Sequence, residues 1–343
     1  MRLRHYYYIA ALLLLCCAAC KQAPEQPQRL LGEAQGTYYS ITYYDSQHRN
    51  LQGAIDSLLD AFDLTASLWV DSSLLRRTNA NLDSVVNADF ANLVRYSAAM
   101  HELTEGAFDC TVGNLVAAWG FSFKKREPMT DAVVDSLRRF VGQQPVVVRD
   151  AEGRYLLRKP APEVTLDFNA IAQGYSTDLI AHFLDSLGIS NYLVDVGGEI
   201  YAHGAKADGT PWRIGIERPA GDKYDSRQVE STIALSNCAV VTSGNYRKYY
   251  EENGVRYSHT IDPTTGRPVR HSLLSVTVVD SVAWRADALA TAFMVMGLER
   301  AKAFIDAHPD DSGTQAVYFI YDEDGTNKTY ATQAFTKLIV DAQ

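Results

Sequence analysis

The stretch Trp284-Arg285-Ala286-Asp287-Ala288-Leu289-Ala290-Thr291-Ala292-Phe293 places two oxygen-bearing side chains among small and apolar neighbours. Asp287 and Thr291 are four residues apart, so on a helix they lie on the same face. The apolar surroundings predict a buried helix, and a buried carboxylate is costly unless something compensates it. Two interpretations follow: the pair binds a hard cation such as Mg²⁺, or Asp287 caps a helix N-terminus while Thr291 bonds back to a carbonyl.

The composition of the chain is that of an ordinary globular protein. It has 343 residues, 47% hydrophobic and 21% charged, enough for one large domain or two small ones. A formal net charge of −9 without a basic stripe argues against nucleic-acid binding. Cys110 and Cys238, the two cysteines of the expected folded part, have no zinc-type spacing. Export would permit a disulfide between them, and two buried thiols are an equal alternative.

The N-terminus has the pattern of an export signal. Arg2 and Arg4 precede an apolar run over residues 9–15, and small residues stand directly before Cys20. This order resembles a bacterial lipobox, although Cys17 stands where Leu is usual. We expect a lipoprotein signal peptide over residues 1–19, lipidation of Cys20, a polar Pro-rich tether over 20–31, and a single domain over 32–343. A simple secretory signal and a weak membrane anchor are the alternatives.

Hydrophobic periodicity predicts helices and strands mixed without a regular alternation. Helices are expected over 51–62, 90–103, 133–140, 171–187 and 299–307 and around Asp287. Strands are expected over 36–44, 163–168, 192–196, 212–217, 232–235, 239–242, 255–260, 274–279 and 316–321, with a hairpin over 146–157. This mixture favours an α+β fold, and no internal apolar run is long enough to span a bilayer.

Four further clusters are rich in polar residues and glycine. They are Thr104–Asp109, Asp167–Tyr175, Val196–Glu199 and Ser258–Gly266. The second lies where a strand is expected to give way to a helix, so its free backbone N–H groups could hold an anion. Each cluster also has an ordinary structural explanation as a turn, a loop or a packed His. Together they favour a site for a phosphate-bearing ligand with a bound cation.

These motifs, in the order found here, resemble the ApbE-type FAD:protein FMN transferases, many of which are exported lipoproteins. The resemblance runs from about Gly36 to about Gly297. It is carried by Gln35-Gly36-Thr37, Ser67-Leu68-Trp69 with Ser73 and Asn79, Gly106–Gly113, Trp119-Gly120-Phe121, Asp167–Tyr175, Asp195–Glu199, Ser243–Arg247, His259–Gly266 and Ala286–Ala292. So many ordered motifs are specific, and they favour the cation interpretation of Asp287 and Thr291.

The resemblance implies a T-fold-like architecture of mixed sheets with packed helices, and a particular set of site residues. The metal, Mg²⁺, would be held by the side chains of Asp287 and Thr291 and the carbonyl of Ala170. FAD would be contacted at Trp69, Ala107, Phe108, Asp109, Asp167, Gln173 and Ile261. Three departures from the family pattern matter: Trp69 replaces Tyr, Gln35 replaces Met, and Gln173 replaces Lys or Glu. Phe168-Asn169 for Leu-Gly is a milder change.

The activity implied is Mg²⁺-dependent transfer of FMN from FAD to a Thr or Ser hydroxyl of a partner protein, with release of AMP. His259 is the candidate base, with a packing or FAD-binding role as the alternative. Family partners carry a D-G-x-[ST]-[GA]-x-[ST] motif and are redox-pump subunits or exported flavoproteins. The expected location is the periplasmic side of a bacterial membrane, held by a lipid anchor. A FAD pyrophosphatase and a non-catalytic FAD-binding lipoprotein are the alternatives.

Overall fold

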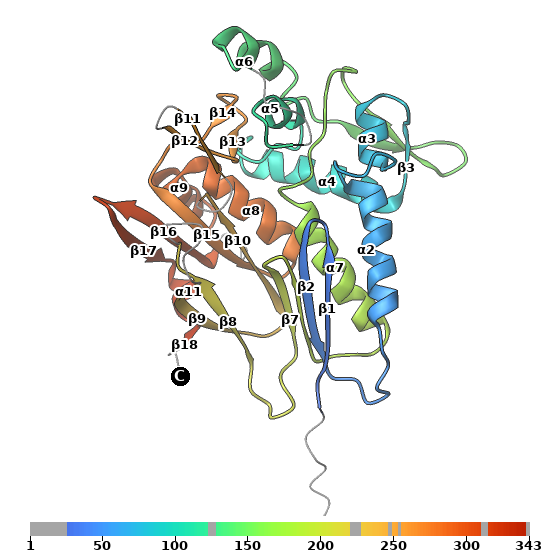
Figure 1. Cartoon of the computed structure of the whole chain (residues 1–343), viewed down its shortest axis with the longest axis vertical. Helices are drawn as coiled ribbons and strands as arrows, with labels where there is room; N and C mark the ends of the chain where they lie inside the picture. The colour runs from blue at the N-terminus through green and yellow to red at the C-terminus, as the bar shows by residue number, and fades with distance from the viewer. Residues whose placement is uncertain are drawn as a thin grey trace, which may run out of the picture.

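An antiparallel sheet of eight strands forms the centre of the molecule, in the order β1-β2-β6-β7-β10-β15-β16-β17 (Figure 1). The computed structural model describes residues 26–122, 128–219, 228–245, 249–252, 255–309 and 315–340. The strands are β1 (Gln28–Ala34), β2 (Thr37–Tyr43), β6 (Tyr192–Val196), β7 (Glu199–His203), β10 (Cys238–Gly244), β15 (Leu273–Asp280), β16 (Val317–Glu323) and β17 (Thr326–Ala331). Every neighbouring pair is antiparallel, so the sheet needs no parallel crossover unit.

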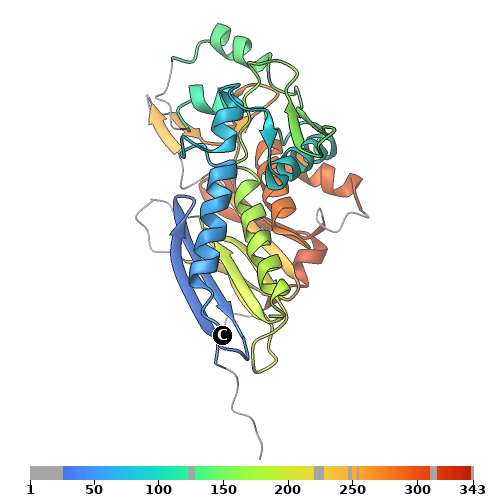
Figure 2. The ribbon, with the colours of Figure 1, turned by 90° about the vertical axis from the view of Figure 1, so that its right-hand side faces the viewer.

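Three long helices cover one face of this sheet. They are α2 (Gln52–Ala66), α7 (Ala172–Ser186) and α8 (Ala283–Met296). Figure 2 shows α2 and α7 side by side in front of the strands. Helix α8 packs on β10 and β15 and against α7, and it is continued by α9 (Leu298–Ala307). Residues 286–290 of α8 are all buried, as the apolar sequence around Asp287 predicts.

A second small sheet covers the opposite face. It consists of β18 (Ile339–Val340), β9 (Val229–Leu235) and β8 (Trp212–Glu217), and the short helix α11 (Gln333–Thr336) lies beside it. The side chains of β16 alternate accordingly. Val317 and Phe319 pack among the helices, whereas Tyr318 and Ile320 pack towards the small sheet. The middle strands of the eight-stranded sheet are therefore covered on both faces, whereas β17 at its edge is largely exposed.

The upper half of the molecule in Figure 1 is built from shorter elements around α4 (Ala88–Leu103). They are α3 (Leu74–Asn79), α5 (Gly113–Ala118), α6 (Asp131–Arg138), the strands β3 (Val85–Val86), β4 (Val146–Arg149) and β5 (Tyr155–Arg158), and the hairpins β11 (Tyr249–Glu252) with β12 (Val255–Ser258) and β13 (Ile261–Asp262) with β14 (Arg267–Pro268). Ile261 packs with Leu115, Trp119 and Val134. This contact fixes the β13–β14 turn against α5 and α6.

The predicted mixed α+β class is confirmed, and most predicted elements are present within a few residues. The strand predicted over 163–168 is wrong. Apart from a single bridge between Thr165 and Val112, this segment is extended chain bonded to loops. The side chain of Asn79 donates to the carbonyl of Leu166 and accepts from its N–H, both at 2.8 Å. These side-chain bonds replace the ladder of a strand partner.

The structure also differs from the predictions at both ends. Strand β1 begins at Gln28, inside the segment expected to be a tether, because its backbone pairs with β2 along the whole of its length. After the last predicted strand the chain continues into β17, α11 and β18. Cys110 and Cys238 are free thiols, and Cys110 is buried. Over the described ranges, no helix combines the length and apolarity that crossing a membrane requires.

Candidate functional site

The carboxylate of Asp287 contacts the first turn of a different helix. Its Oδ2 accepts a hydrogen bond of 3.1 Å from the backbone N–H of Gly174, at the start of α7. Asp287 is the fifth residue of α8, which begins at Ala283, so it does not cap its own helix. The capping interpretation therefore predicted the type of hydrogen bond correctly, but it assigned the bond to the helix that carries Asp287. The donor is instead a backbone N–H in the first turn of α7.

This contact also leaves the carbonyl of Ala170 outside the hydrogen-bond series of α7. In a continued helix the N–H of Gly174 would donate to the oxygen of Ala170. Here Gly174 donates to Asp287, and the regular series begins with Tyr175 N donating to Ile171 O at 3.0 Å. Ala170 itself lies in the turn before α7. The Gly174 bond thus places Asp287 at the first turn of α7, which directly follows the turn that carries the Ala170 carbonyl.

Thr291, the third predicted ligand, lies one turn after Asp287 on α8. Its hydroxyl is 3.3 Å from the hydroxyl of Ser243 on β10. Burial, and after it the charge of Asp178, raises the pKa of Asp287 above its usual range. A nearby positive charge stabilises the ionised form of a buried carboxylate. The donor set of carboxylate, hydroxyl and carbonyl oxygens therefore fits a hard cation.

Clusters built only from acidic residues, His and Cys offer no alternative metal site. Within the described part of the chain, no three such residues gather closely enough to hold a metal ion. The predicted Mg²⁺ ligands differ from such a cluster, because one of them is a carboxylate and the other two are a hydroxyl and a backbone carbonyl.

Two loops that carry predicted FAD contacts run side by side above α7. Asp167 N donates to Cys110 O at 2.8 Å, which brings Asp167 next to the segment Ala107–Asp109. Burial raises the pKa of Asp167 to about 6, and its Oδ2 has no hydrogen-bond partner among the described residues. A buried acceptor of this kind has room for an N–H or O–H donor, which agrees in chemistry with the predicted ligand contact but does not test it.

Asp109 is held more firmly than Asp167. Its Oδ1 accepts from Thr111 N at 2.7 Å, from Thr111 Oγ1 at 2.6 Å and from Gln144 Nε2 at 2.9 Å. Its Oδ2 lies 3.2 Å from Nδ1 of His101. Burial raises the pKa of Asp109, but the contacts with His101 and Thr111 outweigh it, so the net shift is downward. The carboxylate is therefore ionised at neutral pH.

A cavity of about 470 Å³ opens beside Asp109. Its wall includes His101, Gly106 and Asp109 on one side, and Pro263 and Thr264 on the other. Two of the four sequence clusters thus meet at one cavity. Asp287 and Thr291 are not part of its wall, so this cavity does not enclose the predicted metal ligands.

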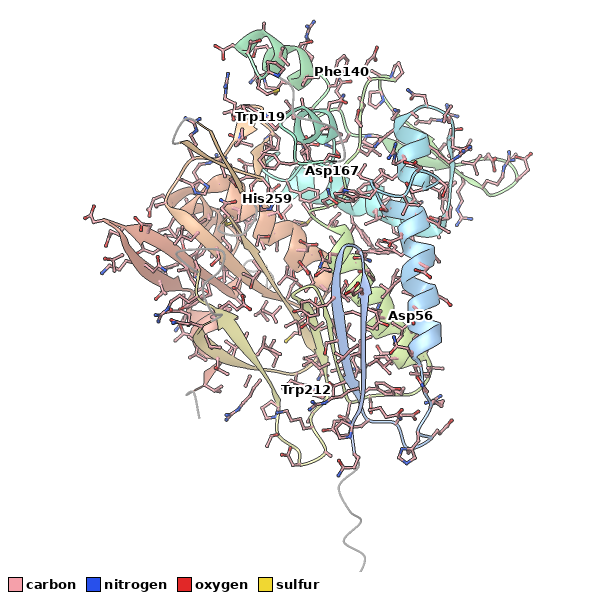
Figure 3. All side chains as sticks on the ribbon, viewed as in Figure 1. Asp56, Trp119, Phe140, Asp167, Trp212 and His259 are labelled. Atoms are coloured by element: carbon pink, nitrogen blue, oxygen red, sulfur yellow. The ribbon has the colours of Figure 1, made fainter. Side chains whose placement is uncertain are left out.

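His259 lies in the same upper part of the molecule as Asp167 and Trp119 (Figure 3). Its ring is half-buried, 6.5 Å from the ring of Phe121. The following residue is fixed, because Thr260 donates through its hydroxyl to Asn245 at 2.9 Å and through its N–H to Ser258 at 3.0 Å. The indole N–H of Trp119 donates to Gly266 O at 2.9 Å, which holds the far end of the turn.

The remaining predicted contacts lie on separate segments of the chain. Trp69 lies in the loop after α2 with 59% of its surface exposed. Gln173 donates to Val196 O at 2.9 Å, which ties the start of α7 to the end of β6. Gln35 accepts from Ser176 at 3.2 Å, which ties the β1–β2 turn to the same helix. Ile261 is buried under α5. Tyr246 and Arg247 of the Ser243–Arg247 motif, and Cys20, lie outside the described residues.

Comparison with known proteins identifies the family of the chain. The ApbE family matches residues 35–317. The chain belongs to the ApbE family. It is 40% identical over 323 residues to the FAD:protein FMN transferase of Vibrio cholerae, covering 92% of this chain and 93% of that protein. The flavin transferase ApbE from Vibrio cholerae superposes with a TM-score of 0.79, covering 92% of this chain and 100% of that chain at 36% identity. The apo form of Pseudomonas stutzeri flavinyl transferase ApbE gives 0.80 at 33% identity, with 94% and 100% covered.

In this ApbE chain the structure adds two residues that the sequence analysis missed. His101 pairs with Asp109. Asp178 bonds the first turn of α8, accepting from Ala283 N and Trp284 N at 2.9 Å each. A weak signal for Asp178 exists, because it lies four residues after Gly174 and so on the same face of the predicted helix. No comparable signal links His101 to Asp109, since residues eight apart on either side of a turn have no fixed relation.

Proposed function

We propose that this chain is an enzyme that moves FMN from FAD to a Thr or Ser hydroxyl of a target protein, with release of AMP and with dependence on Mg²⁺. Its relatives at 40% and 34% identity bear the name FAD:protein FMN transferase. The observation that carries the metal part of the proposal is the bond from Gly174 to Asp287, which holds Asp287 at the first turn of α7, directly after the turn that bears the Ala170 carbonyl.

The reaction is a phosphoryl transfer. The acceptor oxygen forms a bond to the FMN-side phosphorus of FAD, the bond from that phosphorus to the bridging oxygen breaks, and AMP leaves. Asp287, Thr291 and Ala170 would hold Mg²⁺, and the cation would supply positive charge to the pyrophosphate. Asp287 supplies the only formal charge in this set, so we expect binding of the cation to depend on it.

The proton of the acceptor hydroxyl must also leave, and His259 is the proposed base. Its segment is fixed on both sides, by Asn245 before the turn and by the Trp119–Gly266 bond after it. A fixed imidazole at the edge of a site can accept a proton near neutral pH.

FAD recognition is proposed to use the two neighbouring acidic loops. Asp167 offers an acceptor that no described residue bonds, and Asp109 offers a carboxylate whose charge is stabilised by His101. The exposed ring of Trp69 is available to stack on a planar ligand. These side chains come from segments nearly 100 residues apart, and their positions relative to one another depend on the fold.

Incubation with FAD, Mg²⁺ and an acceptor carrying the D-G-x-[ST]-[GA]-x-[ST] motif tests the proposal. Mass spectrometry of the acceptor should show covalent FMN, and AMP should appear in equal amount. Free FMN plus AMP with an unmodified acceptor would instead identify a pyrophosphatase. Unchanged FAD would identify a protein that only binds it. Membrane subunits of redox pumps and exported flavoproteins are the acceptors to try first.

The proposed location is the periplasmic side of a bacterial membrane, anchored by lipid on Cys20. The basic start, the short apolar run and the small residues before Cys20 support this. We expect Cys20→Ser to be exported yet recovered in the soluble fraction. A variant that stays with the membrane would mean that the apolar run itself is the anchor.

A further inference from the structure

Helices α7 and α8 both begin without a cap of their own. The residues at the N-cap positions are Ile171 for α7 and Val282 for α8, and neither side chain bonds the first turn of its helix. Backbone N–H groups in a buried first turn need acceptors, because leaving them without partners is costly. The acceptors must therefore come from elsewhere in the fold.

Each helix supplies the acceptor for the other. Asp287 on α8 accepts from Gly174 in the first turn of α7, at 3.1 Å. Asp178 on α7 accepts from Ala283 N with Oδ1 and from Trp284 N with Oδ2, both at 2.9 Å, in the first turn of α8. Gly174 and Asp178 are four residues apart, as are Ala283 and Asp287, so the two helix starts overlap in antiparallel orientation. We call this arrangement the reciprocal cap.

The reciprocal cap depends on very close packing of the two helices. A Cβ atom at Gly174 would lie 2.4 Å from Ala283 O and 2.9 Å from the Cβ of Asp287. Gly174 is therefore pressed against the same first turn of α8 that Asp178 binds. On its other side, α8 is tied to the sheet by Arg285, whose Nη1 lies 2.7 Å from Oδ2 of the buried Asp280. The first turn of α8 is thus held against α7 and also tied to the end of β15.

We propose that Asp178 is a positioning residue for the metal site, acting through the reciprocal cap to hold Asp287 beside the Ala170 turn. This rests on the proposed function, because it assigns Asp287 as a Mg²⁺ ligand. Asp178 is buried and bonds two backbone N–H groups, so it is not itself available as a ligand. Its loss would free the first turn of α8, which precedes Asp287 by a single turn.

The effect should be specific to the cation. Removing a group that orients a metal ligand typically lowers metal affinity by about 10-fold to 100-fold. We expect Asp178→Ala to raise the Mg²⁺ concentration for half-maximal AMP release by that factor, with kcat at saturating Mg²⁺ within about threefold of wild type. Asp178→Asn keeps one of the two acceptors and should give an intermediate shift, which also covers the case in which the alanine variant fails to fold.

The matched control is Thr332→Ala. Thr332 is also a buried cap, since its Oγ1 accepts from Phe335 N at 3.4 Å and from Val317 N at 3.0 Å. It lies at α11, on the opposite face of the sheet from α7 and α8. This control should lose thermal stability while keeping the wild-type Mg²⁺ requirement.

A second readout avoids turnover. With FAD present and no acceptor, Mg²⁺ should raise the thermal midpoint of each variant as binding proceeds. The Mg²⁺ concentration that gives half of the rise in thermal midpoint should be higher for Asp178→Asn than for Thr332→Ala. If Asp178→Asn, Thr332→Ala and wild type had equal Mg²⁺ requirements, the positioning role of Asp178 would be wrong. The assignment of Asp287 as a Mg²⁺ ligand would not be affected. If the wild type showed no Mg²⁺ dependence in either assay, the proposed metal site would itself be wrong, and the role of Asp178 would fall with it.

Discussion

Gly174→Ala is the substitution that most directly tests the contact between α7 and α8. The added methyl carbon would lie 2.4 Å from the backbone oxygen of Ala283, whereas ordinary contact begins at 3.4 Å. The two helices would have to separate by about 1 Å to restore ordinary contact, because a backbone oxygen of a helix cannot change its position as a flexible side chain can. A separation of this size would lengthen the 3.1 Å bond from Gly174 to Asp287 beyond hydrogen-bond range.

The stability change and the activity change should differ in size. Alanine gains about 1 kcal/mol over glycine in a helix, while overpacking costs about 1–3 kcal/mol, so the net loss of unfolding free energy is roughly 0–2 kcal/mol. A misplacement of about 1 Å in a site can lower activity about 100-fold. We therefore expect a folded protein with FMN transfer reduced about 100-fold.

Urea unfolding and AMP release, measured on the same preparations, separate these effects. Gly53→Ala is the matched control, because Gly53 is also in the first turn of a helix and a Cβ there meets nothing within 4 Å. The control should keep full activity. If Gly174→Ala matched the control in both turnover and Mg²⁺ requirement, close packing of α7 on α8 would not be needed for the site.

Three further substitutions test individual site residues. Asp287→Ala should abolish Mg²⁺-dependent AMP release with the fold retained, and wild-type turnover at ordinary Mg²⁺ would refute its role as ligand. Trp69→Ala should weaken FAD binding about fivefold, from loss of about 1 kcal/mol of stacking. Since Trp69 is 59% exposed, stability should hardly change, and unchanged FAD affinity in a titration would exclude a stacking role. His259→Ala should slow the chemical step by about 10²-fold to 10⁴-fold, with less loss at high pH. Normal single-turnover rates combined with poor FAD binding would assign His259 to binding instead.

Local patterns determined the elements whose burial follows a simple period. The apolar spacing in α2, α4 and α7, and the alternation in β2, predicted these elements to within a few residues. The ordered motifs also determined the family. The segment 163–168 shows the limit of this reasoning. Its strand-like pattern reflects burial, yet its hydrogen bonds go to the Asn79 side chain and to the loop at Cys110, which are distant in sequence.

The features of the site also divide into those that the sequence predicted and those that only the tertiary structure determined. The spacing of Asp287 and Thr291 on a buried helix could be read from the sequence alone, and it pointed to a cation or a cap. Only the tertiary structure decided which backbone groups these oxygens meet. Asp287 receives a donor from Gly174, 113 residues earlier, and Asp178 returns two bonds to the start of α8. Periodicity fixes which side chains share a face of one helix. The pairing of two helix starts depends on the packing of the whole sheet and on a glycine small enough to let them meet.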